Sequence, residues 1–264
     1  MYNTELYFRF TRLGDYVHVL FLIFPLILLI SPADLFSSKT IIVFFANLSL
    51  TAFGYMYNDL EDAEDDYHDV EKRKRNPISS GEISQRQSYV FNLFLISAGL
   101  YLFKLISPNV FFLGIIFAFV GFVYSWKTLR LKSRPILDLV SHVIFLGGLQ
   151  FLTTYAAFRP LDLFVVPFLL IVVPISMMNE ILHELQDYEV DKDTKITNTV
   201  QRFERSDLKK FLFALLALVV IGFSVIILTI PVENRLINVP ISLVIGIFTL
   251  YRLGTRTLRI PLSN

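Results

Sequence analysis

The stretch FLFALLALVVIGFSVIILTI, residues 211–230, contains no charged side chain. It covers the roughly 20 mostly apolar residues that an α-helix needs to cross the hydrocarbon core of a bilayer. It is too long for a buried strand and lacks the period-two alternation of a half-buried one. The stretch therefore indicates a membrane-spanning helix.

Seven further stretches have the same character. Together, the predicted spans cover residues 16–31, 40–57, 88–106, 110–126, 135–158, 161–182, 208–230 and 236–251. The chain of 264 residues is 54% hydrophobic and only 18% charged, and its mean hydropathy is +0.58. This composition excludes a soluble globular enzyme and a disordered chain. We expect an all-α, polytopic membrane helical bundle of eight spans that forms one integral-membrane domain over residues 1–264.

Two further features narrow the function classes. The chain contains no Cys, which excludes thiol catalysis, disulfide frameworks and Cys-ligated metal sites. Its formal net charge of +1 is not that of a nucleic-acid binder, so we expect no nucleic-acid partner.

Lys and Arg are divided unevenly between the predicted loops. Of the 24 basic residues, four fall in the predicted outer segments, namely Lys39, Lys104, Arg159 and Arg235. Cytoplasmic loops of membrane proteins carry the excess of Lys and Arg. We therefore expect a multi-pass protein of the cell membrane with both termini in the cytoplasm.

Acidic residues gather in two windows, 59–71 and 180–193, which hold 14 of the 23 acidic residues. Each window lies at the inner end of a predicted span. Both contain a trio of acidic residues spaced three and four apart: Asp59, Asp62 and Asp66, then Glu184, Asp187 and Asp191. This common register predicts an internal repeat with halves near 1–126 and 135–264.

Residues with this spacing fall within an arc of about 60° on a helix, so each trio lines one face. Three carboxylates on one face near a bilayer repel one another unless cations neutralise them. Mg²⁺ suits such oxygen ligands and completes its coordination with water and substrate phosphates. The two trios would then hold Mg²⁺ ions around one diphosphate. The alternative is that they are solvated charges at helix ends.

Four segments resemble signatures of the UbiA superfamily of intramembrane prenyltransferases. Residues 58–66, NDLEDAEDD, fit its first signature N-D-x-x-D-x-x-x-D, and residues 187–191, DYEVD, fit its second, D-x-x-x-D. Residues 75–81, RNPISSG, resemble its R-P-[LI]-x-[SA]-G segment, and residues 124–132, YSWKTLRLK, resemble its Y-S-P-P-L-R-L-K segment. The family usually has nine spans, so a ninth span is the alternative to the eight predicted here.

The resemblance implies a Mg²⁺-dependent enzyme, with Mn²⁺ as a substitute, that binds a polyprenyl diphosphate on the cytoplasmic side of the bundle. The implied metal ligands are Asp59, Asp62, Asp66, Asp187 and Asp191, with Asn58 and Glu184 completing or orienting the shell. The candidates for binding the diphosphate are Lys127, Arg130, Lys132, Arg9 and Arg12. Tyr124 could offer a π face to an allylic cation.

The expected reaction moves an isoprenyl group onto an apolar or amphipathic acceptor, such as a quinone precursor, a carotenoid or a lipid intermediate dissolved in the membrane. One alternative is a terpene cyclase of the same superfamily, which needs no acceptor. The other is a divalent-cation carrier. Carriers often place their ion site near the midplane between inverted repeats, whereas both acidic trios here are predicted at one membrane face.

Overall fold

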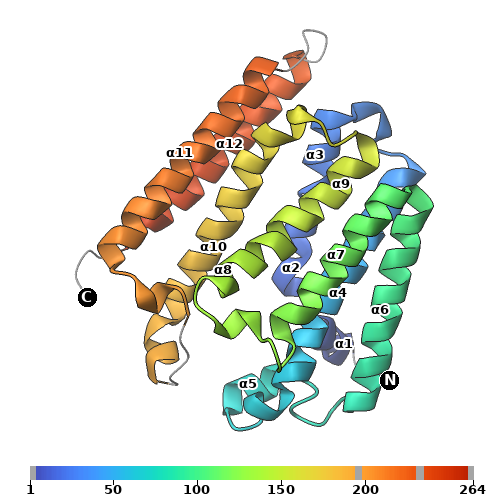
Figure 1. Cartoon of the computed structure of the whole chain (residues 1–264), viewed down its shortest axis with the longest axis vertical. Coiled ribbons are helices and arrows are strands. Elements are labelled where there is room, and N and C mark those ends of the chain that lie inside the picture. Colours follow the sequence, from blue (N-terminus) through green and yellow to red (C-terminus); the bar gives the residue numbers. More distant parts are fainter. Residues whose placement is uncertain (1–3, 194–197, 230–234, 261–264) are drawn as a thin grey trace. The chain divides into compact units, whose positions relative to one another are not determined.

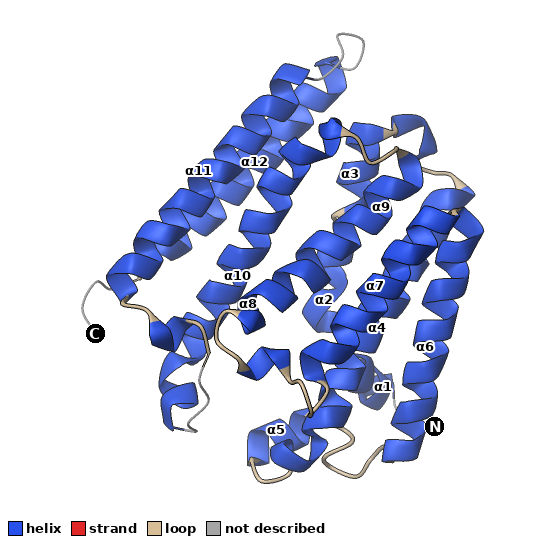
Figure 2. Cartoon of the chain, in the orientation of Figure 1, coloured by secondary structure: helices blue, strands red, loops and turns tan. Residues whose placement is uncertain are grey.

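The computed structural model describes residues 4–193, 198–229 and 235–260, and all regular elements in these ranges are helical (Figures 1 and 2). Seven helices of the described residues are long and apolar enough to cross a membrane. They correspond to seven of the eight predicted spans. The chain divides into two compact units, one of residues 1–130 and 152–160 and the other of residues 131–151 and 161–264. The predicted repeat of halves stays a prediction.

The first predicted span, 16–31, is not one continuous helix. It follows α1 (Thr4–Thr11) and is divided into α2 (Leu13–Leu20) and α3 (Ile23–Ile30). The interruption begins at Phe21, four residues before Pro25. A proline nitrogen cannot donate the helical hydrogen bond to the carbonyl four residues earlier, and its ring crowds that carbonyl. Pro25 thus removes one hydrogen bond of the helical ladder at this break.

In the first unit, α4 (Ser38–Asp66) is the central helix, and it packs against α6 (Gln85–Ile106) and α7 (Pro108–Ser125). Figure 1 shows these three helices running side by side. Ser37 caps the start of α4 by accepting a hydrogen bond from the amide of Thr40. The helix then continues through the acidic signature to Asp66. A short basic helix, α5 (Val70–Arg75), follows, with Asp69 as its N-cap.

In the second unit, α10 (Val166–Asp193) packs against α11 (Arg205–Thr229), which packs against α12 (Arg235–Leu258). A further helical segment joins α8 (Leu137–His142), a π-helical turn (Val143–Leu149) and α9 (Gln150–Phe158), whose last residues belong to the first unit. The short helical turns η2 (Leu131–Ser133) and η5 (Val200–Arg202) lie in the loops.

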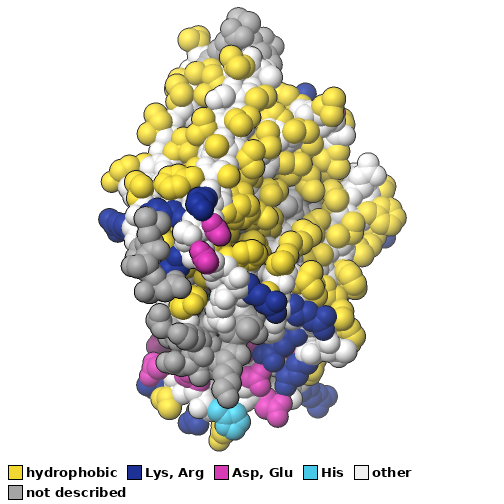
Figure 3. Space-filling view, turned by 60° about the vertical axis from the view of Figure 1, so that its left-hand side comes forward, with side chains coloured by type: hydrophobic (Ala, Val, Ile, Leu, Met, Phe, Trp, Pro, Cys, Tyr) yellow, Lys and Arg dark blue, Asp and Glu magenta, His cyan; other side chains and the backbone are white. Residues whose placement is uncertain are grey.

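Large apolar side chains stay exposed along these helices. Val244, Ile247 and Phe248 of α12 are 67%, 66% and 63% exposed. Figure 3 shows a face that is mostly hydrophobic, with charged side chains gathered toward its lower end. Exposed apolar surface of this extent fits contact with lipid tails.

The contact between α11 and α10 depends on Gly222. A Cβ atom at this position would lie 2.8 Å from the Pro167 carbonyl oxygen and 2.7 Å from Cγ1 of Ile171. The nearest obstacles include backbone, which cannot rotate away. Close approach of helices at small residues is the usual basis of packing in membranes.

We expect Gly222→Ala to lower the thermal unfolding midpoint of the detergent-purified protein, because overpacking costs about 1–3 kcal/mol. Gly254→Ala in α12 is the matched control, since a Cβ there meets no atom within 4 Å. Removing this glycine should leave the midpoint equal or slightly higher. Equal midpoints for both variants would contradict the packing role of Gly222.

Candidate functional site

The first acidic signature occupies the last turns of α4. Asp59 and Asp66 are buried, with 2% and 8% exposure, and Asp62 is partly exposed. The carbonyl end of a helix carries partial negative charge, so carboxylates at this end are destabilised by the helix dipole as well as by one another. Neighbouring segments must supply positive charge for the signature to fold as helix.

Arg12, between α1 and α2, supplies the charge beside Asp59. Its Nη1 lies 3.0 Å from Oδ1 of Asp59, and its Nη2 lies 2.6 Å from Oδ2 of Asp15. The guanidinium carbon also lies 5.2 Å from the centre of the Tyr55 ring. Burial disfavours the charged guanidinium, but Asp59 and Asp15 outweigh it, so the pKa of Arg12 is raised.

Arg130 performs the same role for Asp62. Its Nη2 donates to Oδ1 of Asp62 at 3.0 Å and to Oδ2 of Asp65 at 2.7 Å. Burial works against its charge, but the hydrogen bonds and charges of Asp65 and Asp62 prevail and raise the pKa of Arg130.

Arg12 and Arg130 share an unusual backbone conformation, with φ values of 51° and 41°. Positive φ is uncommon outside glycine and costs of order 1–3 kcal/mol. Such strain persists where the surrounding structure compensates for it, and functional sites are common places. Both arginines that reach the first signature therefore sit on strained backbone.

Lys127 joins the site from the turn after α7. Its Nζ donates to Oε2 of Glu64 at 2.8 Å, and its backbone amide donates to Oε2 of Glu61 at 2.9 Å. The hydrogen bond to Glu64 raises the pKa of Lys127. The segment 124–132 thus brings two predicted basic residues, Lys127 and Arg130, onto the acidic end of α4.

Asn58 orients one signature carboxylate directly. Its Nδ2 donates to Oδ2 of Asp62 at 3.1 Å, and its Oδ1 accepts from the hydroxyl of Ser125 at 3.0 Å. Ser125 is the last residue of α7 and is fully buried. Asn58 thus links the Asp62 carboxylate to the end of α7, and its predicted role in a metal shell stays a prediction.

Arg9 is placed differently from Arg12. Its Nη2 lies 2.8 Å from Oε2 of Glu82, and its Nη1 donates to the carbonyl of Lys74 at 2.7 Å. The hydrogen bond from Arg9 lowers the pKa of Glu82. In these contacts Arg9 fastens α1 to the loop around α5, whereas Arg12 reaches the signature itself.

The two remaining predicted residues of this region lie near the end of α7. Tyr124 is half-buried in the last turn of α7. Lys132 lies in η2, which belongs to the second unit. Their predicted roles stay predictions.

The second signature lies in the last turns of α10, but the side chains of Asp187 and Asp191 are outside the described residues. Glu184 is buried at 7% exposure, and its Oε2 accepts a hydrogen bond from the amide of Val200 at 3.0 Å. Asp138 in α8 similarly accepts from the amide of Thr199 at 2.8 Å. In the described structure, Glu184 anchors the segment that follows α10.

The carboxylate oxygens of the first signature determine whether a divalent cation fits there. The described side chains contain no group of three or more His, Asp and Glu that converges as a ready metal cage. However, Oδ2 of Asp59 is buried and has no hydrogen-bond partner among the described residues. An orphaned carboxylate oxygen is costly unless it meets a cation, and oxygen is the ligand Mg²⁺ prefers. The first signature therefore fits a hard divalent cation.

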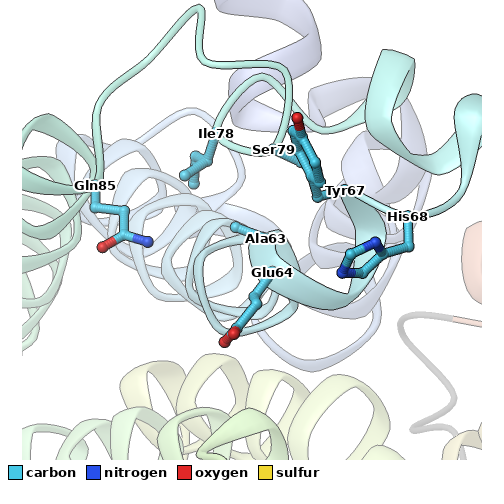
Figure 4. Close-up of a pocket in the computed structure, with 7 residues that line it drawn as sticks. All are labelled: Ala63, Glu64, Tyr67, His68, Ile78, Ser79 and Gln85. Carbon is cyan, nitrogen blue, oxygen red and sulfur yellow. The ribbon is translucent and has the colours of Figure 1, made fainter.

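Sequence reasoning missed Asn76, whose buried amide contacts both Asp59 and Asp66. Asn76 lies inside the segment 75–81, whose resemblance to a family signature could have identified it as a candidate site residue. A pocket of about 310 Å³ lies beside this loop, at the end of α4 (Figure 4). Its lining residues are Ala63, Glu64, Tyr67, His68, Ile78, Ser79 and Gln85.

Comparisons with known proteins agree with the fold. The model of the UbiA prenyltransferase family matches residues 19–260. A 4-hydroxybenzoate octaprenyltransferase from Shewanella sp. (strain ANA-3) is 28% identical over 134 residues, which are 50% of this chain and 46% of that protein. The chain thus aligns with about half the length of this curated relative.

Solved structures extend the likeness over the whole fold. A UbiA homolog from Archaeoglobus fulgidus bound to GPP and Mg²⁺ has a TM-score of 0.72 at 21% identity, covering 96% of this chain and 95% of that one. A structure of digeranylgeranylglyceryl phosphate synthase has a TM-score of 0.74 at 21% identity, covering 99% of this chain and 90% of that one.

The pairing of Arg12 with Asp59 predicts a selective loss of stability. Their side chains are only 14% and 3% exposed. Arg12→Gln should lower the free energy of unfolding by about 3–5 kcal/mol, because it leaves a buried carboxylate without its counter-charge. Arg12→Gln combined with Asp59→Asn should recover much of that loss in thermal unfolding.

Lys74→Gln is the control, because Lys74 pairs with Glu71 at side-chain exposures of 68% and 82%. Exposed pairs of this kind contribute little, so no measurable change is expected. If Arg12→Gln were as stable as Lys74→Gln, Asp59 would not depend on Arg12.

Proposed function

The chain belongs to the UbiA prenyltransferase family, and we propose that this integral membrane protein transfers an isoprenyl group from a polyprenyl diphosphate to an apolar or amphipathic acceptor. The observation that carries the proposal is the end of α4. There, a buried carboxylate oxygen of Asp59 has no hydrogen-bond partner among the described residues, beside arginines that could turn to a diphosphate. The GPP and Mg²⁺ in the Archaeoglobus homolog support this chemistry.

In the proposed reaction, the C–O bond between the allylic carbon and the diphosphate breaks, and both electrons leave with the diphosphate. The allylic carbon then bonds to the acceptor, which releases a proton. Bound Mg²⁺ would stabilise the negative charge that collects on the leaving group. Mn²⁺ is proposed to substitute.

The residues of this chain would share the remaining work. Asp59, Asp62 and Asp66 are proposed ligands of the cation, with Asn58 orienting Asp62. Arg130 and Lys127 already bind oxyanions, so they could exchange carboxylate partners for diphosphate oxygens, Arg130 through its forked donors. Arg12 would likewise exchange the carboxylate of Asp59 for a diphosphate oxygen. Lys132 and Arg9 are also proposed to bind the diphosphate; in the described structure, Arg9 contacts Glu82 and the carbonyl of Lys74.

For the second signature we propose that Asp187 and Asp191 also act as metal ligands. Glu184 is proposed to serve them by holding the segment after α10 through Val200. Tyr124 is proposed to face the allylic cation. The excess of Lys and Arg in the predicted inner loops supports a plasma-membrane protein with its site on the cytoplasmic face.

The direct test incubates the purified protein with labelled farnesyl or geranylgeranyl diphosphate, Mg²⁺ and a membrane lipid extract. Mass analysis should find a prenylated acceptor and free diphosphate, and EDTA should abolish both. Turnover that is unaffected by EDTA would contradict the proposal. The mass of the product identifies the acceptor class.

We expect Asp62→Asn and Asp191→Asn each to reduce turnover by at least ~100-fold, equivalent to about 2.7 kcal/mol of transition-state stabilisation. Glu71→Gln is the matched control, because Glu71 is acidic and close in sequence but its side chain is 82% exposed. Near-normal turnover in either signature variant would remove that signature from the proposed site.

The same assay separates a transferase from a terpene cyclase. A transferase must admit a second substrate beside the allylic carbon, whereas a cyclase excludes nucleophiles and wraps the chain. With the acceptor withheld, we expect little or no cyclic hydrocarbon from an allylic diphosphate. Efficient conversion to a single cyclic terpene would overturn the assignment as a transferase, while the proposed binding and ionisation of the prenyl diphosphate would still hold.

A further inference from the structure

The side chain of Asn76 uses all of its hydrogen-bonding capacity while 1% exposed. Its Nδ2 donates to the backbone carbonyl of Asp59 at 2.7 Å and to Oδ2 of Asp66 at 3.0 Å. Its Oδ1 accepts from the amides of Ile78 at 3.0 Å and Ser79 at 3.3 Å. One amide group therefore joins the loop after α5 to two residues of the first signature.

The local sequence explains the orientation of this side chain. Asn76 ends α5 in an extended conformation, as expected before Pro77. An asparagine at such a position commonly closes a turn by accepting from amides two or three residues ahead. Closing that turn uses only the Oδ1 atom of Asn76. The two bonds made by Nδ2 are additional, and both reach α4.

The loop is not fastened to α4 by close packing throughout. The pocket in Figure 4 is lined by Ile78 and Ser79 of the loop, by Ala63 of α4 and by Tyr67, which follows the end of α4. The hydroxyl of Ser79 is buried there without a hydrogen-bond partner among the described residues. The side-chain amide of Asn76 thus attaches the loop to α4 next to this pocket.

We propose that Asn76 is a positioning residue that holds the Asp66 carboxylate in one orientation for the divalent cation, and so couples the loop at residues 76–79 to the metal site. This assignment rests on the proposed function. A hydrogen bond to one carboxylate oxygen restricts rotation of the group and leaves the other oxygen for a ligand. Groups that orient metal ligands in this way typically contribute 10–100-fold to metal affinity.

Asn76→Ser isolates the bonds to α4. A serine hydroxyl can still accept from the amide of Ile78 and keep the turn, but it is too short to reach Asp59 and Asp66 together. Asn47→Ser is the matched control, because Asn47 is a fully buried asparagine of α4 that bonds Val43, Thr153 and Thr154. Both substitutions should lower the thermal unfolding midpoint.

The two variants should differ in a measurement that involves no turnover. Calorimetry with geranyl thiodiphosphate over a range of Mg²⁺ concentrations gives the Mg²⁺ concentration at half-maximal binding. We expect Asn76→Ser to raise this concentration by about 10-fold or more, and Asn47→Ser to leave it unchanged. An unchanged Mg²⁺ requirement in Asn76→Ser would make Asn76 a purely structural residue.

A second variant keeps the proposal testable if Asn76→Ser does not fold. Asn76→Gln keeps the carboxamide but lengthens the side chain by one methylene, so its amide nitrogen cannot keep both bonds to Asp59 and Asp66 in their present geometry. It should still bind the analogue with a raised Mg²⁺ requirement. A wild-type requirement in Asn76→Gln would overturn the assignment alone, whereas analogue binding by the unaltered protein that EDTA does not change would overturn the proposed function as well.

Discussion

The accumulation of carboxylates at the carbonyl end of α4 is the constraint on which the rest of the site depends. The helix dipole and the mutual repulsion of Asp59, Asp62 and Asp66 both oppose this arrangement. Arg12 and Arg130 offset it from two different segments of the first unit. Because the signature carboxylates hold Arg12 and Arg130 in return, two guanidinium groups lie directly beside the carboxylates. Under the proposed function, a diphosphate and a divalent cation would replace both partners with little change in net charge.

Most of the fold follows from the distribution of apolar residues, and the exception has a local cause. Long, mostly apolar stretches predicted seven helices that the structure confirms. The first stretch has the same hydropathy, yet α2 and α3 divide it. A hydropathy argument averages over a window and does not register that Pro25 removes one donor from the helical ladder. Division of the chain into two units, with residues 152–160 joining the first, depends on tertiary contacts that composition does not reveal.

The candidate site was predictable where charge or a signature identified a residue. Arg12, Lys127 and Arg130 were identified from the sequence, and the structure brings all three onto the acidic end of α4. Asn76 was missed because an asparagine before proline is ordinarily explained by turn formation, and its second role depends on what its Nδ2 meets. Glu184 was predicted to serve the metal from its register alone. Its bond to Val200 depends on a loop whose path the register does not encode.

The proposed function requires the first signature to hold the divalent cation together with the diphosphate. A crystal structure of the protein with Mn²⁺ and geranyl thiodiphosphate, using anomalous scattering to locate the metal, tests this requirement. We expect Mn²⁺ at coordination distance from carboxylate oxygens of Asp59, Asp62 or Asp66, with Arg130 turned toward the diphosphate. Bound analogue with no Mn²⁺ at these carboxylates, or with Arg12 and Arg130 still paired to them, would contradict it.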